Sequence, residues 1–423
     1  MRSVILAAAL FFVAPAAFAQ NIYVTADRLL DVRTGRMIED PAVVIQDGII
    51  TAVGPVASTQ VPSAAEIIEL PGVTLLPGLI DMHTHLDSDP TFGGFMGFTV
   101  TDAFWSVIAV PNAKATLDAG FTTVRNVGSG DWNDVALKQA IEMGKIEGPR
   151  IMPAGYSFGA TGGHCDATGL PPSFDAHSPF NVDSPDEGRK RVREVRKYGA
   201  EVIKICATGG VFSHNTEPGQ QQLTFAEMKA IADEAHMWGL KVAAHAHGAS
   251  GIRDAALAGI DTIEHASLID DEGIAAAKKM GTWLSMDIYN TDYTQSEGAK
   301  NGVMEDNLRK DREIAEVQRQ GFKRALQAGV KMVYGTDSGV YPHGDNAKQF
   351  AVMVRYGATP LQAIQAATIN AAEALGWKGK VGIIEKGAFG DLVGVMGDPT
   401  RDVTLLEHPE FVMKGGETVK APE

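Results

Sequence analysis

The centre of the chain alternates apolar runs with longer amphipathic segments. One apolar run, residues 73–82, ends at His83, and seven more follow it: residues 122–127, 150–154, 202–206, 242–245, 262–265, 282–286 and 332–336. Such short apolar runs are typical of buried parallel strands, and the segments between them are long enough for helices. The pattern predicts an α/β fold in which residues 77–381 form a (β/α)8 TIM-like barrel.

Two of the expected helices carry clear start and stop signals. Thr224 and Glu227 match a capping box, in which each side chain bonds the other residue's backbone N–H. Residues 359–362, Thr-Pro-Leu-Gln, offer an N-cap, a proline in the first turn and a glutamine at the third position. Gly376 suits the end of that helix.

Both ends of the chain show a denser pattern of short β-like pieces and turns. They are residues 22–24, 42–45 and 49–53 near the start, and residues 390–395 and 410–416 near the end. Turns at this density favour a small β-sandwich. We therefore expect residues 20–76 and 382–423 to pair into one β-sandwich domain beside the barrel.

The first residues have the pattern of a secretory signal peptide. Arg2 precedes an apolar stretch that is too short for a membrane span, and Ala17-Phe18-Ala19 matches a cleavage site. We expect residues 1–19 to be removed, which leaves a periplasmic or secreted protein with no membrane segment. An uncleaved membrane anchor is the disfavoured alternative.

The net charge limits the binding partners to be expected, and the cysteine count limits the disulfide bonds. The formal net charge of −15 argues against nucleic acid and anionic membranes as partners. Cys165 and Cys206 are the only cysteines, too few for a disulfide framework. Cys206 falls in a predicted buried strand, so we expect a free thiol there, although an oxidising compartment leaves a bond between the two open.

The candidate chemistry lies at the ends of the predicted strands. His83 and His85 are two residues apart on an extended segment, so both imidazoles project from one face and can reach one metal ion. The C-terminal ends of barrel strands form the catalytic rim of this fold. Four more residues lie at or near the ends of predicted strands at that rim: Lys204, His245, His265 and Asp337.

These residue types suit a two-metal site. Imidazoles and a carboxylate bind divalent ions such as Zn²⁺. A buried lysine has a lowered pKa, and its neutral amine can add CO₂ to become a carbamate that bridges two metals. Asp337 can bind a metal and carry a proton to the leaving group. Each residue alone has an ordinary structural explanation, such as an exposed lysine or a turn aspartate, but the six together favour a metal site.

Several motifs resemble the amidohydrolase superfamily over nearly the whole mature chain. They are residues 76–85, 120–125, 336–337, 367–372 and 386–393. The resemblance implies that His83, His85 and Asp337 hold the more buried of two divalent ions, expected to be Zn²⁺. It also implies that His245 and His265 hold the more exposed ion and that carboxylated Lys204 bridges the pair.

Within that superfamily the chain is similar to the metal-dependent carboxypeptidases and Xaa-Pro dipeptidases, a branch that includes ochratoxin-hydrolysing amidohydrolases. This implies cleavage of the amide to a C-terminal amino acid, including hydrolysis of ochratoxin A to ochratoxin alpha and phenylalanine. The substrate would be a small molecule or dipeptide-like compound with a free carboxylate, and the protein a homo-oligomer. An Xaa-Pro dipeptidase is the alternative within the branch.

Four residues are candidates for substrate contact, each with a plainer explanation. Residues 159–164 resemble the substrate loop of that branch, so His164 could bind the scissile carbonyl or the carboxylate, or be a loop histidine without a role. Arg125 could contact a carboxylate or pair within the barrel. His247 follows His245 by two residues, and we favour a role beside the ligands over metal binding. Tyr289 lies on a rim loop and could line the pocket.

Two other functional classes compete with this hypothesis. Mononuclear deaminases on this scaffold commonly place a glutamate three residues after the fifth-strand histidine, where this chain has Gly248. A non-catalytic binding scaffold would usually have lost metal ligands, whereas this chain keeps all six. A binuclear amide hydrolase therefore remains the leading hypothesis.

Overall fold

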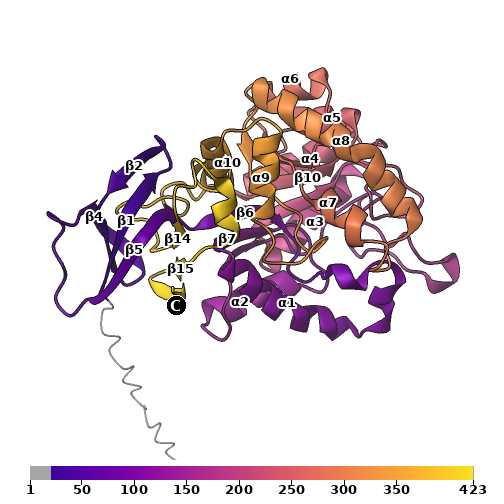
Figure 1. Cartoon of the computed structure of the whole chain (residues 1–423). Coiled ribbons are helices and arrows are strands. Elements are labelled where there is room, and N and C mark those ends of the chain that lie inside the picture. Colours follow the sequence, from indigo (N-terminus) through magenta and orange to yellow (C-terminus); the bar gives the residue numbers. More distant parts are fainter. Residues whose placement is uncertain (1–20, 423) are drawn as a thin grey trace, which may run out of the picture.

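The computed structural model describes residues 21–422. The predicted signal peptide, residues 1–19, lies outside the described residues. Figure 1 shows a helix-covered barrel with a smaller sheet at one side. Among the described residues, no helix combines the length and the apolar character needed to cross a membrane.

The barrel is built from eight parallel strands in two ladders, β6-β7-β8 and β13-β12-β11-β10-β9. Parallel bridges from Phe158 to Ile205 and from Thr84 to Ser338 join the ladders at both seams. The fold is therefore the α/β barrel that the apolar pattern predicts. Its strands are β6 (Leu79–Thr84), β7 (Phe121–Asn126), β8 (Arg150–Pro153), β9 (Val202–Cys206), β10 (Lys241–Ala246), β11 (Thr262–His265), β12 (Trp283–Ser285) and β13 (Met332–Val333).

Helices surround the barrel (Figure 1). They are α1 (Asp102–Asp118), α2 (Asn133–Glu142), α3 (Pro185–Lys197), α4 (Phe225–Met237), α5 (Ala249–Ala258), α6 (Asp271–Met280), α7 (Asn290–Glu297), α8 (Glu305–Gln327), α9 (Lys348–Arg355), α10 (Pro360–Ala366) and α11 (Ile369–Leu375). Short 3-10 helices are η1 (Pro90–Phe92), η2 (Gly94–Thr99), η3 (Pro172–Phe174) and η4 (Val403–Glu407).

The predicted helix signals are confirmed at the N-termini of α4 and α10. The predicted capping box from Thr224 to Glu227 forms, and the predicted N-cap Thr359 forms a second one with Gln362. The helix that begins at Pro360 does not run unbroken to its predicted end, because α10 ends at Ala366 and α11 begins at Ile369. Gly376 then caps α11 with a φ of 79°.

The two ends of the chain pair into one β domain, as expected, and its strands form a single eight-stranded hydrogen-bonded sheet where the turn pattern favoured a sandwich. Its order is β16-β15-β14-β5-β1-β3-β4, with β2 paired to β1. The junction between the two ends is the antiparallel pair of β14 and β5. The strands are β1 (Asn21–Asp31), β2 (Arg36–Glu39), β3 (Pro41–Gln46), β4 (Ile49–Pro55), β5 (Glu66–Pro77), β14 (Leu392–Met396), β15 (Phe411–Lys414) and β16 (Glu417–Lys420).

The apolar run before His83 is two strands, not the single strand expected. The chain leaves the small sheet at the end of β5, passes Gly78 and enters the barrel as β6. A Cβ atom at Gly78 would lie 2.1 Å from Thr122 Oγ1 and 2.9 Å from Asp391 Cβ. Only glycine fits at this crossing point, and a hydrophobic pattern alone does not show where one buried strand ends and the next begins.

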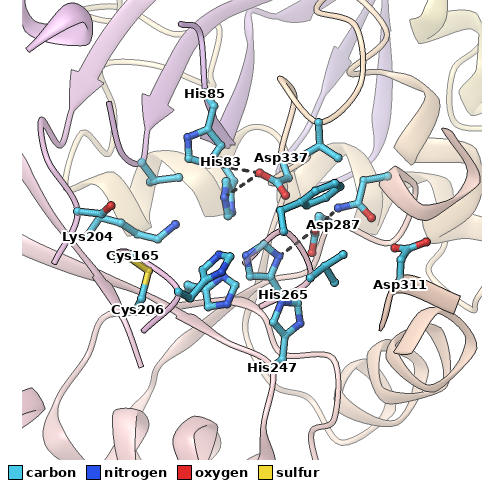
Figure 2. Close-up of a pocket in the computed structure, with 18 of the residues that line it drawn as sticks. His83, His85, Cys165, Lys204, Cys206, His247, His265, Asp287, Asp311 and Asp337 are labelled. Carbon is cyan, nitrogen blue, oxygen red and sulfur yellow. Dashed lines mark hydrogen bonds and ion pairs between the residues drawn. A yellow bond between two sulfur atoms is a disulfide. The ribbon is translucent and has the colours of Figure 1, made fainter. Parts of the chain in front are cut away.

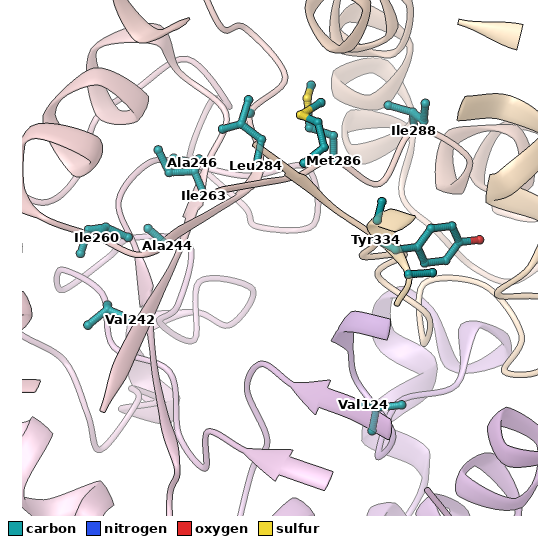
Figure 3. Packing of buried hydrophobic residues seen from close by; sticks show 14 of the residues in the cluster. Val124, Val242, Ala244, Ala246, Ile260, Ile263, Leu284, Met286, Ile288 and Tyr334 are labelled. Atoms are coloured by element: carbon teal, nitrogen blue, oxygen red, sulfur yellow. The ribbon is translucent and has the colours of Figure 1, made fainter. Parts of the chain in front are cut away.

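The alternation of side chains along each strand decides which of them enter the barrel. On β10, Val242, Ala244 and Ala246 pack in the main hydrophobic core, shown in Figure 3. The intervening positions face inward, and His245 is one of them. The same alternation on β9 places Lys204 inside. Strand periodicity therefore delivers these two side chains to the barrel interior.

Candidate active site

A cavity of about 290 Å³ lies at the C-terminal ends of the barrel strands. Figure 2 shows that the side chains around it converge from several strand ends. The structure brings all six predicted metal ligands to this one cavity: His83, His85, Lys204, His245, His265 and Asp337.

His83, His85 and Asp337 form one side of the cavity. Asp337 Oδ1 lies 3.3 Å from His83 Nε2 and 3.4 Å from His85 Nε2. Burial raises the pKa of Asp337, but the two histidines outweigh it and hold that pKa well below its usual value. Asp337 is therefore a carboxylate at neutral pH, which is the form that binds a metal ion.

Three histidines, His245, His247 and His265, form the opposite side. Each offers a ring nitrogen, and these atoms all lie within 4.8 Å of one another. Burial and the neighbouring imidazoles lower the pKa of His245 and His247 well below the ordinary value. Neutral imidazoles are the metal-binding form, so His245 and His247 are ready to receive a cation. The structure therefore places His247 in the same group as the two predicted ligands His245 and His265.

Lys204 lies between these groups, with only 4% of its surface exposed. Burial lowers the pKa of its amine to about 8, against the opposing attraction of Glu264 and Asp337. At pH 7 about a tenth of such amines would be neutral, compared with less than a thousandth of free lysines. The amine therefore has the nucleophilic form that addition of CO₂ requires.

Glu264, the residue before His265, is a buried carboxylate that the sequence pattern does not predict in the site. Its Oε2 lies 3.1 Å from His83 Nδ1, and its Oε1 accepts a 2.6 Å hydrogen bond from Arg125 Nη2. Burial raises the pKa of Glu264, but the charges of Arg125 and His83 lower it far below the usual range. A carboxylate on the far ring nitrogen fixes the orientation of a ligating histidine and increases its basicity.

Asp287 supports His265 in the same way and was also missed. Its Oδ2 lies 2.9 Å from His265 Nδ1, and its Oδ1 accepts a 2.9 Å hydrogen bond from Gln318 Nε2. Asp287 follows strand β12 by two residues, so an acidic residue just past a strand end was the available signal.

Arg125 is placed inside the barrel and not at the cavity. Its Nε donates to Met82 O at 2.6 Å and its Nη1 donates to Thr262 Oγ1 at 2.7 Å, while Nη2 binds Glu264. With these donors engaged and 1% of the residue exposed, the guanidinium does not reach a substrate. Substrate contact by Arg125 is therefore corrected to pairing within the barrel.

Of the other substrate candidates, His164 lines the cavity and Tyr289 does not. His164 lines the cavity, stacks on His245 with ring centroids 4.1 Å apart, and has its Nδ1 2.8 Å from Ser213 Oγ. Burial, and next the nearby His265, lower the pKa of His164 to about 3, so the ring is neutral. Tyr289 packs against Tyr341 with ring centroids 5.0 Å apart and is not among the residues that line the cavity.

The expectation of a free thiol at Cys206 is wrong, because the structure has a Cys165–Cys206 disulfide. Cys206 occupies the last, inward-facing position of β9, and both cysteines line the cavity. The bridge from Phe158 to Ile205 brings the loop that follows β8 beside β9. The two Cα atoms are 5.8 Å apart, a separation usual for a disulfide. This proximity arises in the tertiary fold and could not be read from the strand pattern.

The donor set fits divalent metal ions. Apart from its 3.3 Å contact with Asp337 Oδ1, buried His83 Nε2 has no hydrogen-bond partner in residues 21–422. Its group with His265 and Asp337, like the three-histidine group, has ligand atoms within 4.8 Å of one another. Because His265 belongs to both groups, the two candidate positions are adjacent.

Comparison with known proteins agrees with this geometry. A model of the amidohydrolase family matches residues 74–419. An Aspergillus niger protein named ochratoxinase is 31% identical over 417 residues, covering 92% of this chain and 84% of the relative.

Solved structures are similar over nearly the full length. A Xaa-Pro dipeptidase with bound methionine superposes with a TM-score of 0.88 and 33% identity, covering 94% of this chain and 99% of the other. The structure of A. niger ochratoxinase gives a TM-score of 0.86 and 27% identity, covering 96% of this chain and 97% of the other.

Proposed function

Because the chain belongs to the amidohydrolase family, we propose that it is a binuclear metal-dependent hydrolase that cleaves the amide bond to a C-terminal amino acid. The observation that carries this proposal is the pair of adjacent ligand groups that share His265 in one cavity with buried Lys204. Two metal positions beside a reactive buried amine suit a bridged pair of ions better than a single ion.

His83, His85 and Asp337 would hold the more buried ion, and His245 and His265 the more exposed one. Lys204, carboxylated by CO₂, would bridge them. When bound, two divalent ions such as Zn²⁺ supply a Lewis acid for the carbonyl and lower the pKa of a water molecule. Glu264 and Asp287 would keep His83 and His265 oriented towards the ions.

Asp337 is suited to carry the proton during hydrolysis. Its Oδ1 faces His83 and His85, which leaves Oδ2 as the atom that would accept a proton from the attacking water. The same atom would then release that proton to the departing amine. The buried position of Asp337 keeps this transfer away from bulk solvent.

The proposed substrate is a small or dipeptide-like compound with a free carboxylate, and ochratoxin A is the first candidate. The similarity to ochratoxinase over most of both chains supports it. Part of the cavity wall is apolar, formed by Val211, Phe212, Ile314 and Val340, and could accept the side chain or acyl group of such a compound. The likeness to a Xaa-Pro dipeptidase supports Xaa-Pro dipeptides as the second candidate.

We also propose that the protein acts outside the cytoplasm. The expected signal peptide points that way, and the Cys165–Cys206 disulfide is of the kind that persists in oxidising compartments.

The test is a hydrolysis panel with the purified full chain in the presence of Zn²⁺ and bicarbonate. The panel contains ochratoxin A, N-acyl amino acids with varied C-terminal residues and Xaa-Pro dipeptides, and released amino acids are measured by chromatography. We expect release of the C-terminal amino acid, loss of activity after chelation, and two metal ions per chain. One tightly bound ion with unmodified Lys204 would contradict the binuclear proposal, and no hydrolysis across the panel would contradict the amide-hydrolase proposal.

A further inference from the structure

The loop between β8 and α3 forms one wall of the candidate active site and carries His164. At its root, Phe158 N donates to Lys204 O at 3.0 Å and Cys206 N donates to Phe158 O at 2.8 Å, as if the loop prolonged β8. After Phe158 the chain leaves this pairing with β9. The disulfide from Cys165 then ties the loop back to the last residue of β9.

The ring of His164 is held in a narrow space. One face stacks on His245, with the ring planes 22° apart. Gly210 lies close by, and a Cβ atom there would approach the His164 ring to 2.3 Å. Ser213 Oγ bonds Nδ1, and Gln222 Oε1 accepts a 2.8 Å hydrogen bond from the His164 backbone N–H. The ring orientation therefore depends on keeping this loop close to β9 and to the loop that follows it.

The disulfide attaches the chain to β9 at the residue next to His164. Cys165 is the next residue along the chain, and Cys206 lies two residues beyond Lys204 on the same inward face of β9. The bond thus connects the strand that presents the proposed bridging lysine to the loop that presents the proposed substrate-binding histidine. Both sulfur-bearing residues line the cavity, as Figure 2 shows.

We propose that the Cys165–Cys206 disulfide is a positioning element for catalysis, which fixes His164 against the histidine cluster. This inference rests on the proposed amide hydrolysis. Without the bond, the loop would be held by hydrogen bonds that exchange with water, and His164 would occupy its productive orientation for a smaller share of the time. Misplacement of a positioning group by about 1 Å can cost as much as a hundredfold in rate.

The decisive experiment is a mutant cycle on kcat/KM with the substrate found in the panel. It compares the Cys165→Ala/Cys206→Ala variant, the His164→Ala variant and the variant with all three changes. We expect about a ten- to hundredfold loss on removal of the disulfide, and no further loss when His164 is already absent. An equal loss in both backgrounds would show that the disulfide acts on general structure, and it would overturn the proposal.

A second measurement removes the dependence on how well the cysteine variants fold. The metal-loaded wild-type protein is treated with a water-soluble phosphine, which is oxidised to its oxide with oxygen from water while the disulfide becomes two thiols. We expect the activity to fall by the same factor as in the disulfide-free variant, which the phosphine leaves unchanged. Full activity after complete reduction, verified by thiol titration, would overturn the proposal.

Hydrogen exchange gives a readout independent of turnover. In metal-free protein we expect reduction to increase amide exchange in residues 159–168 and to leave β10 unaffected. Unchanged exchange in that loop would overturn the proposal. A wild-type protein that hydrolyses no member of the panel would instead defeat the proposed function, and the exchange result would still report whether the disulfide fixes the loop.

Discussion

The two ends of the barrel use charged side chains in opposite ways. At the N-terminal ends of the strands, Lys138 pairs with Glu142 at 2.9 Å and with Glu201 at 3.0 Å, and Lys241 pairs with Asp261 at 2.8 Å. At the C-terminal ends, buried histidines crowd one another, and burial displaces the pKa of Lys204 to about 8. At the N-terminal end the charged groups are paired and partly exposed, whereas at the C-terminal end titratable groups are buried together.

Cavity size alone would have selected the wrong end. The N-terminal ends surround a cavity of about 930 Å³, compared with about 290 Å³ at the catalytic end. The larger cavity is lined by residues of the ion pairs, including Lys138, Glu142 and Glu201. The arrangement agrees with the division of labour usual in this fold, with chemistry at the C-terminal face and stability at the other. The burial of many titratable side chains together, and not volume, distinguishes the C-terminal end.

The largest effect should come from Lys204→Ala. Removal of the amine removes the proposed bridge between two metal ions, and we expect activity to fall by about a thousandfold or more. Short carboxylic acids such as formate or acetate should restore part of the activity, because their two oxygens can replace the carbamate. Steady-state kinetics with and without these acids checks this, with circular dichroism as the control for folding. Wild-type activity in the variant would remove Lys204 from the site.

Asp337→Asn should produce the next largest loss. The amide cannot take up and release a proton as the carboxylate does, so we expect kcat to fall by about 10²- to 10⁴-fold. KM should change much less, since the proposed role of Asp337 is in turnover. Metal content measured on the same sample separates loss of an ion from loss of proton transfer. A variant that keeps kcat and changes only KM would contradict the proton role.

Glu264→Gln tests whether a buried carboxylate beneath the cavity is needed for metal binding and for stability. His83 would lose its carboxylate partner, and we expect metal affinity to weaken by about 10- to 100-fold. Arg125 would also be left buried with an unpaired charge, which destabilises proteins by about 3–5 kcal/mol. Metal titration and urea unfolding of the metal-free protein measure the two effects. Unchanged metal affinity would confine Glu264 to a structural role.

The position of Glu264 also shows what the sequence could and could not predict. Strand alternation places Lys204 and His245 in the barrel correctly, because both lie within regular strands. His265 breaks that rule. It ends β11 with a φ of 68°, so its side chain and that of Glu264 both point into the barrel. Strict alternation allows only one of two adjacent residues to point inward, so with His265 assigned to the interior it predicts that Glu264 points away.

The disulfide and the β5–β6 junction were missed for a different reason. Each depends on two segments that meet only in the folded chain, Cys165 with Cys206 and Gly78 with Thr122. A hydrophobic pattern reports the environment of a residue and not the identity of its neighbours. Spacing at strand ends did bring the six proposed ligands to one cavity, because barrel topology places all strand ends at one rim, independently of loop conformation.

The smallest effect should come from the N-terminal end, where Lys138→Ala removes a partly exposed cation from two ion pairs. Glu142 and Glu201 are exposed enough to be solvated when Lys138 is absent. We expect less than about 1 kcal/mol of destabilisation and unchanged kcat/KM. Urea unfolding of the metal-free protein and kinetics of the loaded protein measure these, with Lys204→Ala as the matched lysine variant at the other end. If Lys138→Ala reduced kcat/KM while metal content stayed complete, the two ends would be coupled, and the separation of chemistry from stability along the barrel axis would fail.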